Sequence, residues 1–179
     1  MTDAATIFVD DVHGPRAEVA GAAIERADAH SEPALEAPDT VALQHVWLAA
    51  QRRPWASLAL IPIGVEAPAK RLAAALAAIG EPYLGAAVVV HDATAVSLAT
   101  LQAELGAMTA RAGRAGRAIV ALPPLLGCPA GLALARAADA VIVCVALGSS
   151  AIAEAEQILD EVGRERVLGS VVFTQKEKR

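Results

Sequence analysis

Apolar and polar positions follow two different patterns along the chain, and the change between them falls near Pro54. After this residue, short apolar runs typical of β-strands alternate with longer segments whose apolar residues recur at helical spacing. The predicted strands are residues 58–63, 86–91, 118–122, 141–147 and 167–173, and the predicted helices are residues 69–79, 95–112, 131–138 and 150–162. Strands that are continuously apolar need helices on both faces. The pattern therefore predicts a doubly wound, mostly parallel α/β sheet in a three-layer sandwich.

The segment before Pro54 divides into an acidic arm and a first helix. Residues 1–39 are rich in alanine, acidic residues and proline, so we expect a flexible arm with at most a local helix over residues 17–29. Residues 41–51 have helical spacing, with Thr40 or Asp39 as N-cap, and we expect them to begin one folded domain over residues 40–179. The glycines that fit as caps or turns near helix ends are Gly80, Gly113, Gly148 and Gly163.

Composition and charge narrow the class of protein. The chain has 179 residues, which suits one domain, and its longest apolar runs fall well short of the roughly 20 residues that cross a bilayer. Residues 1–12 lack the basic start and the long apolar run of a secretion signal, so we expect a cytoplasmic protein. The net charge is −5, and residues 1–39 alone hold nine acids and two arginines. This acidic balance argues against nucleic acid as a partner.

The loop after the first predicted strand has the length and frame of the phosphate-binding loop G-x-x-x-x-G-K-[ST]. It reads Gly64-Val65-Glu66-Ala67-Pro68-Ala69-Lys70-Arg71. Gly64 and Lys70 match the motif, whereas Ala69 replaces its second glycine. Arg71 replaces the hydroxyl residue that binds magnesium, and Pro68 removes a backbone N–H from a loop that presents such groups to phosphate.

Later segments add a family resemblance. Residues 118–126 resemble the Walker B strand of bacterial tyrosine kinases and their MinD and ParA relatives, which ends in Asp-x-Pro-Pro; the Asp position here is Ala121. Residues 133–145 resemble the helix, corner and strand that follow, and residues 167–173 resemble the last strand, with Phe173 at the adenine-contacting Asn. Asp92 stands at the Walker A′ position. Over residues 40–173 the chain resembles the P-loop kinase-like ATPases of bacterial polysaccharide export.

The resemblance implies a P-loop NTPase-like fold and a membrane polysaccharide co-polymerase as a partner on its cytoplasmic face. The family's cofactor is ATP with Mg²⁺, and its metal is held by the loop hydroxyl and the Walker B Asp, which are both missing here. We therefore expect no catalytic residue, no cofactor and no metal. The predicted function is a non-catalytic subunit that regulates or scaffolds exopolysaccharide, capsule or holdfast synthesis and export, recruited to the inner membrane through its partner.

Three alternatives stay open at this point. The first is a divergent P-loop ATPase or tyrosine autokinase that binds Mg-ATP through Lys70 and Asp92. The second is a positioning protein of the MinD and ParA type, which the polar residues 174–179 do not favour. The third is self-association, although the family's ring-assembly motif E-x-x-R-x-x-R is replaced by Val41, Gln44 and Trp47. The chain's only tyrosine is Tyr83, so the family's tyrosine cluster is also missing.

Aromatic and basic residues have both a structural and a binding interpretation. Trp47 and Trp55 flank a short arginine-rich turn and suit either the packing of the first helix or contact with a partner. Arg111, Arg114 and Arg117 form a basic cluster that we expect in a flexible loop, either solvated or bound to an acidic surface.

The remaining polar candidates favour structural roles. Asp139 is expected to accept backbone N–H groups just before a buried strand. Cys128 has no histidine near it in sequence that would activate the thiol, and Cys144 lies in an apolar run typical of a core. His91 and the other histidines have no metal-ligand spacing, so the sequence predicts no metal site.

Overall fold

The computed structural model describes residues 7–10, 17–19, 40–64, 67–147 and 152–174. A seven-stranded sheet runs through its centre in the order β2-β1-β7-β6-β3-β5-β4. The strands are β1 (Ile7–Asp10), β2 (Ala17–Val19), β3 (Ser57–Ile63), β4 (Val89–Asp92), β5 (Ala118–Ala121), β6 (Ala140–Leu147) and β7 (Val167–Thr174). The helices are α1 (Thr40–Ala50), α2 (Ala69–Leu84), α3 (Leu101–Ala115), α4 (Pro129–Ala137) and α5 (Ile152–Val162), with a 3₁₀ turn over Arg164–Arg166. Strands β3 to β7 are parallel, which confirms the predicted α/β fold.

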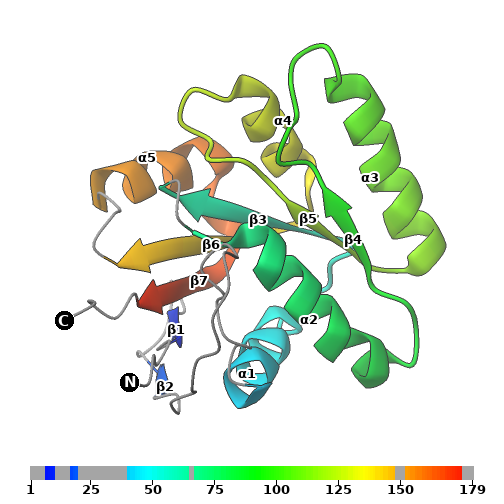
Figure 1. Cartoon of the computed structure of the whole chain (residues 1–179), viewed down its shortest axis with the longest axis vertical. Helices are drawn as coiled ribbons and strands as arrows, with labels where there is room; N and C mark the ends of the chain where they lie inside the picture. Colours follow the sequence, from blue (N-terminus) through cyan, green and yellow to red (C-terminus); the bar gives the residue numbers. More distant parts are fainter. Residues whose placement is uncertain (1–6, 11–16, 20–39, 65–66, 148–151, 175–179) are drawn as a thin grey trace, which may run out of the picture.

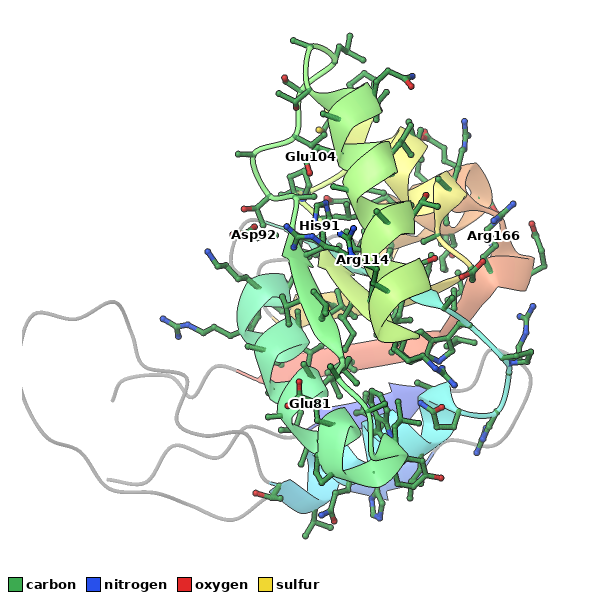
Figure 2. All side chains as sticks on the ribbon, turned by 90° about the vertical axis from the view of Figure 1, so that its right-hand side faces the viewer. Glu81, His91, Asp92, Glu104, Arg114 and Arg166 are labelled. Carbon is green, nitrogen blue, oxygen red and sulfur yellow. The ribbon has the colours of Figure 1, made fainter. Side chains whose placement is uncertain are left out.

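Helices cover both faces of the sheet, as Figure 1 shows. Helices α1 and α2 pack on one face, and α3, α4 and α5 pack on the other. Successive side chains of a strand point to opposite faces, so Leu58 and Leu60 of β3 join the first core, and Ala59 and Ile61 join the second. Figure 2 views the molecule from the side of α3 and the edge strand β4. The predicted three-layer sandwich is therefore confirmed.

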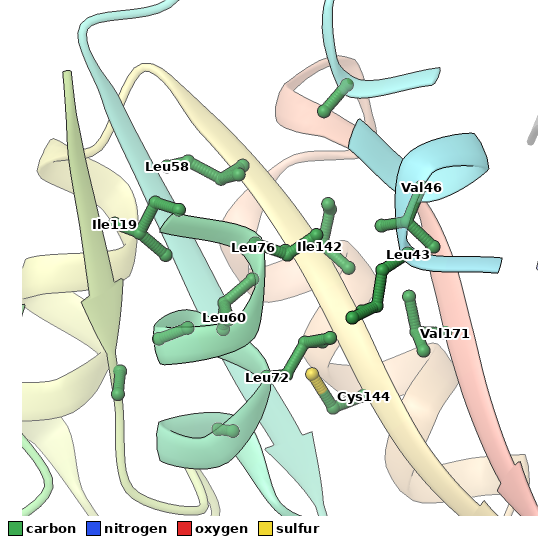
Figure 3. Close-up of a cluster of buried hydrophobic side chains, with 14 of the residues drawn as sticks. Leu43, Val46, Leu58, Leu60, Leu72, Leu76, Ile119, Ile142, Cys144 and Val171 are labelled. Atoms are coloured by element: carbon green, nitrogen blue, oxygen red, sulfur yellow. The ribbon is translucent and has the colours of Figure 1, made fainter. Parts of the chain in front are cut away.

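The core under α1 and α2 is built from aliphatic side chains of two helices and the sheet (Figure 3). Leu43 and Val46 of α1 and Leu72 and Leu76 of α2 are all buried. Cys144 of β6 is fully buried in the same core, and this burial raises the pKa of its thiol to about 12. The prediction that Cys144 is a core residue is confirmed.

Most element boundaries lie within a few residues of the prediction, and the largest difference is at α3. The pattern predicts a start at residue 95, whereas α3 begins at Leu101. The delay has a local cause, because Ser97 and Thr100 hydrogen-bond each other's side chains and backbone in a turn before the helix. Among the helices of the described ranges, none is both long enough and apolar enough to cross a membrane.

The expectation of a flexible arm over residues 1–39 is wrong for two segments. Strand β1 pairs antiparallel with β2 and with β7, where Val9 lies opposite Val171. Residues 7–9 have high β propensity, and the edge of β7 offers backbone groups that need partners. Residues 17–19 form β2 rather than the start of a helix. The sheet therefore takes in strands from before residue 40, and residues 20–39 lie outside the described ranges.

Gly80 does not end a helix, as the sequence suggested, but lies inside α2 against Trp47. A Cβ added at Gly80 would lie 2.3 Å from the nearest ring carbon of Trp47. The Trp47 ring also packs edge to face with Trp55 and Tyr83, at centroid distances of 5.8 and 6.2 Å. The glycine therefore makes room for an aromatic ring, a contact between α1 and α2 that local spacing does not reveal.

We expect Gly80→Ala to lower the free energy of unfolding by about 1–3 kcal/mol, because the Trp47 ring must move to admit the new methyl group. Gly106→Ala in α3 is the matched control, since nothing lies within 4 Å of its added Cβ. Without a clash, that change should leave stability equal or raise it by up to about 1 kcal/mol. Urea unfolding measures both, and equal effects of the two substitutions would contradict this account of Gly80.

Candidate functional site

The carboxyl ends of the parallel strands β3, β4 and β5 lie together and form the carboxyl edge of the sheet. Doubly wound folds bind ligands at this edge. β3 is the switch point, because the chain continues from it to β4 and β5 on one side and to β6 and β7 on the other. The register places Asp92 of β4 beside Ala121 of β5, and Ala121 beside Leu60 of β3. The Walker A′ and Walker B positions predicted from sequence therefore lie side by side.

Lys70 and Asp92 form an ion pair at this edge. The Lys70 Nζ lies 2.6 Å from the Asp92 Oδ2, which joins the first turn of α2 to the end of β4. The other carboxylate oxygen accepts hydrogen bonds from the Thr94 hydroxyl at 2.7 Å and the Thr94 backbone N–H at 3.2 Å. The hydrogen bond from Lys70, followed by those from Thr94, lowers the pKa of Asp92 to about 2. The lysine of the motif is therefore paired with a carboxylate of the chain itself.

In the described part of the loop between β3 and α2, two backbone N–H groups have acceptors within the chain. Gly64 has a φ of +77°, a conformation that glycine adopts without strain, and its N–H lies 3.5 Å from the Glu154 Oε1 of α5. The Ala69 N–H donates to the Ala67 carbonyl at 2.9 Å, and Pro68 has no N–H. Val65 and Glu66 lie outside the described residues. Of these groups, the Gly64 N–H faces a carboxylate and the Ala69 N–H donates within the loop, whereas Pro68 has no N–H to offer.

Known structures share this architecture. The kinase domain of the Escherichia coli tyrosine kinase ETK matches with a TM-score of 0.62 and 11% identity, over 79% of this chain and 78% of that one. The chimerical protein CapA2B2 matches with a TM-score of 0.56 and 12% identity, over 78% and 84%. The BceF tyrosine kinase domain matches with a TM-score of 0.53 and 12% identity, over 76% and 74%. The chain has the fold of a bacterial tyrosine kinase domain.

At this level of identity the likeness concerns the fold alone. No protein-family model matches the sequence, and no curated protein matches it significantly. The resemblance to bacterial tyrosine kinases predicted from sequence motifs is confirmed as a kinase-like, P-loop NTPase-like fold. What this fold does in the present chain depends on the residues at the sheet edge.

The residues at this edge of the kinase-like fold do not fit Mg-ATP. Lys70 contacts Asp92 at 2.6 Å, and the Walker B position is the fully buried methyl group of Ala121. Arg71 offers no hydroxyl, and within the described ranges no three His, Cys, Asp or Glu side chains gather as a metal site. Phe173, at the position of the adenine-contacting Asn, is buried in the core under α1 and α2. The described residues of this edge therefore lack the hydroxyl and acidic side chains that would hold Mg²⁺.

A buried histidine lies next to the site and was missed as a feature of it. His91 precedes Asp92 on β4 but faces α3, where its Nε2 lies 2.8 Å from the Glu104 Oε2 (Figure 2). Burial, and then the positive charge of Arg111, lower the pKa of His91 against the opposing effect of Glu104. Burial thus disfavours the charged form of the ring, which packs as part of the α3 interface. Its signal in the sequence was a polar residue inside an apolar strand.

The interpretation of Trp47 and Trp55 as partner contacts is wrong for this conformation. Both side chains are buried, at 1% and 5% exposure, because α1 packs on α2 and the sheet through them. The Trp55 Nε1 also donates to the Ala50 carbonyl at 2.9 Å. This hydrogen bond connects the residues just before β3 to the end of α1. The packing alternative for these residues is the one that the structure supports.

The basic cluster does not form a flexible loop. Helix α3 continues through Arg111 and Arg114, since Gly116 rather than Gly113 caps it with a left-handed φ of +80°. Arg111 donates to the Val90 carbonyl at 3.0 Å. The Arg117 guanidinium lies 4.2 Å from the centroid of the Trp55 ring, a cation–π contact. Of the three arginines, Arg114 is the exposed one, and it stays a candidate partner contact.

Asp139 and Cys128 have structural contacts. Asp139 Oδ2 accepts hydrogen bonds from the backbone N–H groups of Ala56 and Ser57 and from the Ser57 hydroxyl, at 2.8 to 3.0 Å. Burial raises the pKa of Asp139, but these hydrogen bonds outweigh it and lower the pKa overall. The predicted structural function of Asp139 is confirmed. The Cys128 Sγ accepts from the Gly131 N–H at 3.4 Å as the N-cap of α4.

We expect Asp139→Ala to lower the free energy of unfolding by about 1–3 kcal/mol, because three donors at the start of β3 lose their charged acceptor. Asp160→Ala is the matched control, since Asp160 of α5 forms an exposed ion pair with Arg164 of the following 3₁₀ turn. That change should cost less than about 1 kcal/mol. Thermal or urea unfolding tests both, and an equally small loss at the two positions would contradict the anchoring role of Asp139.

Lys70→Ala should raise the pKa of Asp92 from about 2 toward the ordinary value of about 3.9, because the largest stabilising contact of the carboxylate is removed. A pKa lowered by folding stabilises the protein above about pH 4, and the contribution is lost as the pH falls toward 2. The difference in stability between wild type and variant should therefore shrink over this range. Carboxyl carbon NMR measures the pKa, and an unchanged value in the variant would disprove the pairing.

Proposed function

We propose that the chain is a non-catalytic, kinase-like protein that binds the cytoplasmic face of a membrane polysaccharide co-polymerase. In this proposal it regulates or scaffolds the synthesis and export of an exopolysaccharide, capsule or holdfast. Two lines of argument support the proposal. The structural neighbours ETK and BceF are tyrosine kinases. The motifs around Pro123-Pro124 and residues 133–145 resemble the kinases of polysaccharide export.

The Lys70–Asp92 ion pair across Ala121 is the observation that carries the proposal. Phosphoryl transfer depends on a lysine that binds phosphate and on acidic and hydroxyl groups that hold Mg²⁺. Here the lysine contacts Asp92 at the end of β4, and the neighbouring strand β5 ends in the methyl group of Ala121. A preserved core with these substitutions favours a protein that works by binding a partner rather than by catalysis.

The alternative of a divergent ATPase or autokinase requires Lys70 to leave Asp92 and a partner to supply the metal ligands. The alternative of a positioning protein of the MinD and ParA type requires a membrane-targeting helix or a nucleic-acid surface. No contact in the described residues favours either one over partner binding.

Biolayer interferometry with the cytoplasmic segments of the co-polymerase encoded in the same genome tests this function. We expect saturable binding that is the same with and without Mg-ATP, because the site has no ligand set for the nucleotide. Absence of binding to these segments would contradict the proposal, as would binding that requires ATP hydrolysis. Lys70→Ala should bind the segments as the wild type does, and this control separates partner binding from nucleotide chemistry.

The exposed Arg114 near the end of α3 is our candidate for the partner surface. We expect Arg114→Gln to weaken binding of the co-polymerase segments, since arginine is among the residues that dominate interfaces. Gln102→Glu, near the other end of the same helix, is the matched control because it changes the net charge by the same amount and its side chain is also exposed. Equal affinities of the two variants would exclude Arg114 from the interface.

A further inference from the structure

Strand β4 ends the described sheet on the side opposite β2, so it pairs with β5 on one side only. We call the other side its outer edge (Figure 2). The N–H groups of Val89 and Ala93 donate to carbonyl groups of β5 and of the residue before it, at 3.1 and 2.9 Å. Backbone groups of alternate residues in a strand point to opposite sides. The backbone groups of Val88 and Val90 therefore point to the outer edge.

Two charged side chains reach this outer edge from opposite layers of the molecule. The Arg111 guanidinium of α3 donates to the Val90 carbonyl at 3.0 Å. The Glu81 Oε1 of α2 accepts from the Val88 N–H at 3.4 Å, a longer contact. Helices α2 and α3 cover opposite faces of the sheet. The two side chains therefore meet the edge of β4 from both faces.

The charge of each side chain matches the backbone group that it contacts. A cation lies on an outward carbonyl and a carboxylate lies on an outward N–H, as the N–H and carbonyl groups of a further strand would. The Asp92 carboxylate accepts from the Thr94 N–H at 3.2 Å in the same way, just past the end of β4. Hydrogen bonds to charged groups are stronger than those between neutral groups. A strand added at this edge would have to displace Arg111 and Glu81 first.

We propose that Glu81 and Arg111 block the outer edge of β4 against strand pairing with a second copy of this chain. Val89 and Val90 have high β propensity, so the strand itself favours pairing. Every copy carries the same four-residue strand, and two such strands can pair antiparallel about a twofold axis. The inference goes beyond the proposed function, because it concerns self-association at a surface that needs no co-polymerase.

Sedimentation velocity over a range of protein concentrations tests this inference. We expect Glu81→Ala/Arg111→Ala to self-associate at least about tenfold more tightly than the wild type. The matched control is Glu156→Ala/Arg164→Ala, which removes one acid and one base from exposed positions and should sediment as the wild type does. Arg111→Ala alone should show most of the increase, because its contact is the shorter one. The single variant keeps the test valid if the double variant does not fold.

Amide hydrogen exchange shows whether β4 forms the new contact. The Val90 and Asp92 N–H groups point to the outer edge, so their exchange in the double variant should slow as its concentration rises. An association constant equal to that of the wild type overturns the inference, and so does an equal increase in the control. Association without protection at β4, or concentration-dependent protection of β4 in the wild type, also overturns it. Binding of the co-polymerase segments is measured separately, and its loss would overturn the proposed function alone.

Discussion

The fold depends on β3, which is buried along its whole length between two layers of helices. All seven of its residues are buried, and it is hydrogen-bonded to β5 on one side and β6 on the other. Its first residue, Ser57, is anchored by Asp139 at the start of β6, which fixes where the strand begins. Its last residue delivers the chain to Gly64 and the loop before α2. The position of the candidate site therefore follows from the burial and register of one strand.

Given this register, the chemistry of the edge is decided by a few side chains. Asp92, Ala121 and Leu60 lie beside one another across three strands, and α2 brings Lys70 to the same place. With a methyl group at the middle position, the lysine and the surviving acid pair with each other. The result is a kinase-like framework whose lysine faces a carboxylate of the chain itself.

The sequence predicts the central strands of the sheet well, but it does not predict the long-range contacts between elements, for a physical reason. Strands β3 to β7 are continuous apolar runs, so local pattern is sufficient to place them and the helices between them. β1 and β2 are short, and their pairing with β7 depends on residues far along the chain. The contact of Gly80 with Trp47 and the ion pair of Lys70 with Asp92 are likewise long-range. The spacing of the loop motif predicted where the site lies. The pairing of Lys70 with Asp92 became visible only in the structure.

Isothermal titration of the purified protein with Mg-ATP, with Lys70→Ala as the control, tests the central claim most directly. The claim is that the kinase-like fold of this chain has no working nucleotide site. It predicts no saturable heat at millimolar nucleotide for either protein. Saturable binding by the wild type that Lys70→Ala abolishes would contradict the claim, because it would show that the lysine leaves Asp92 to bind phosphate.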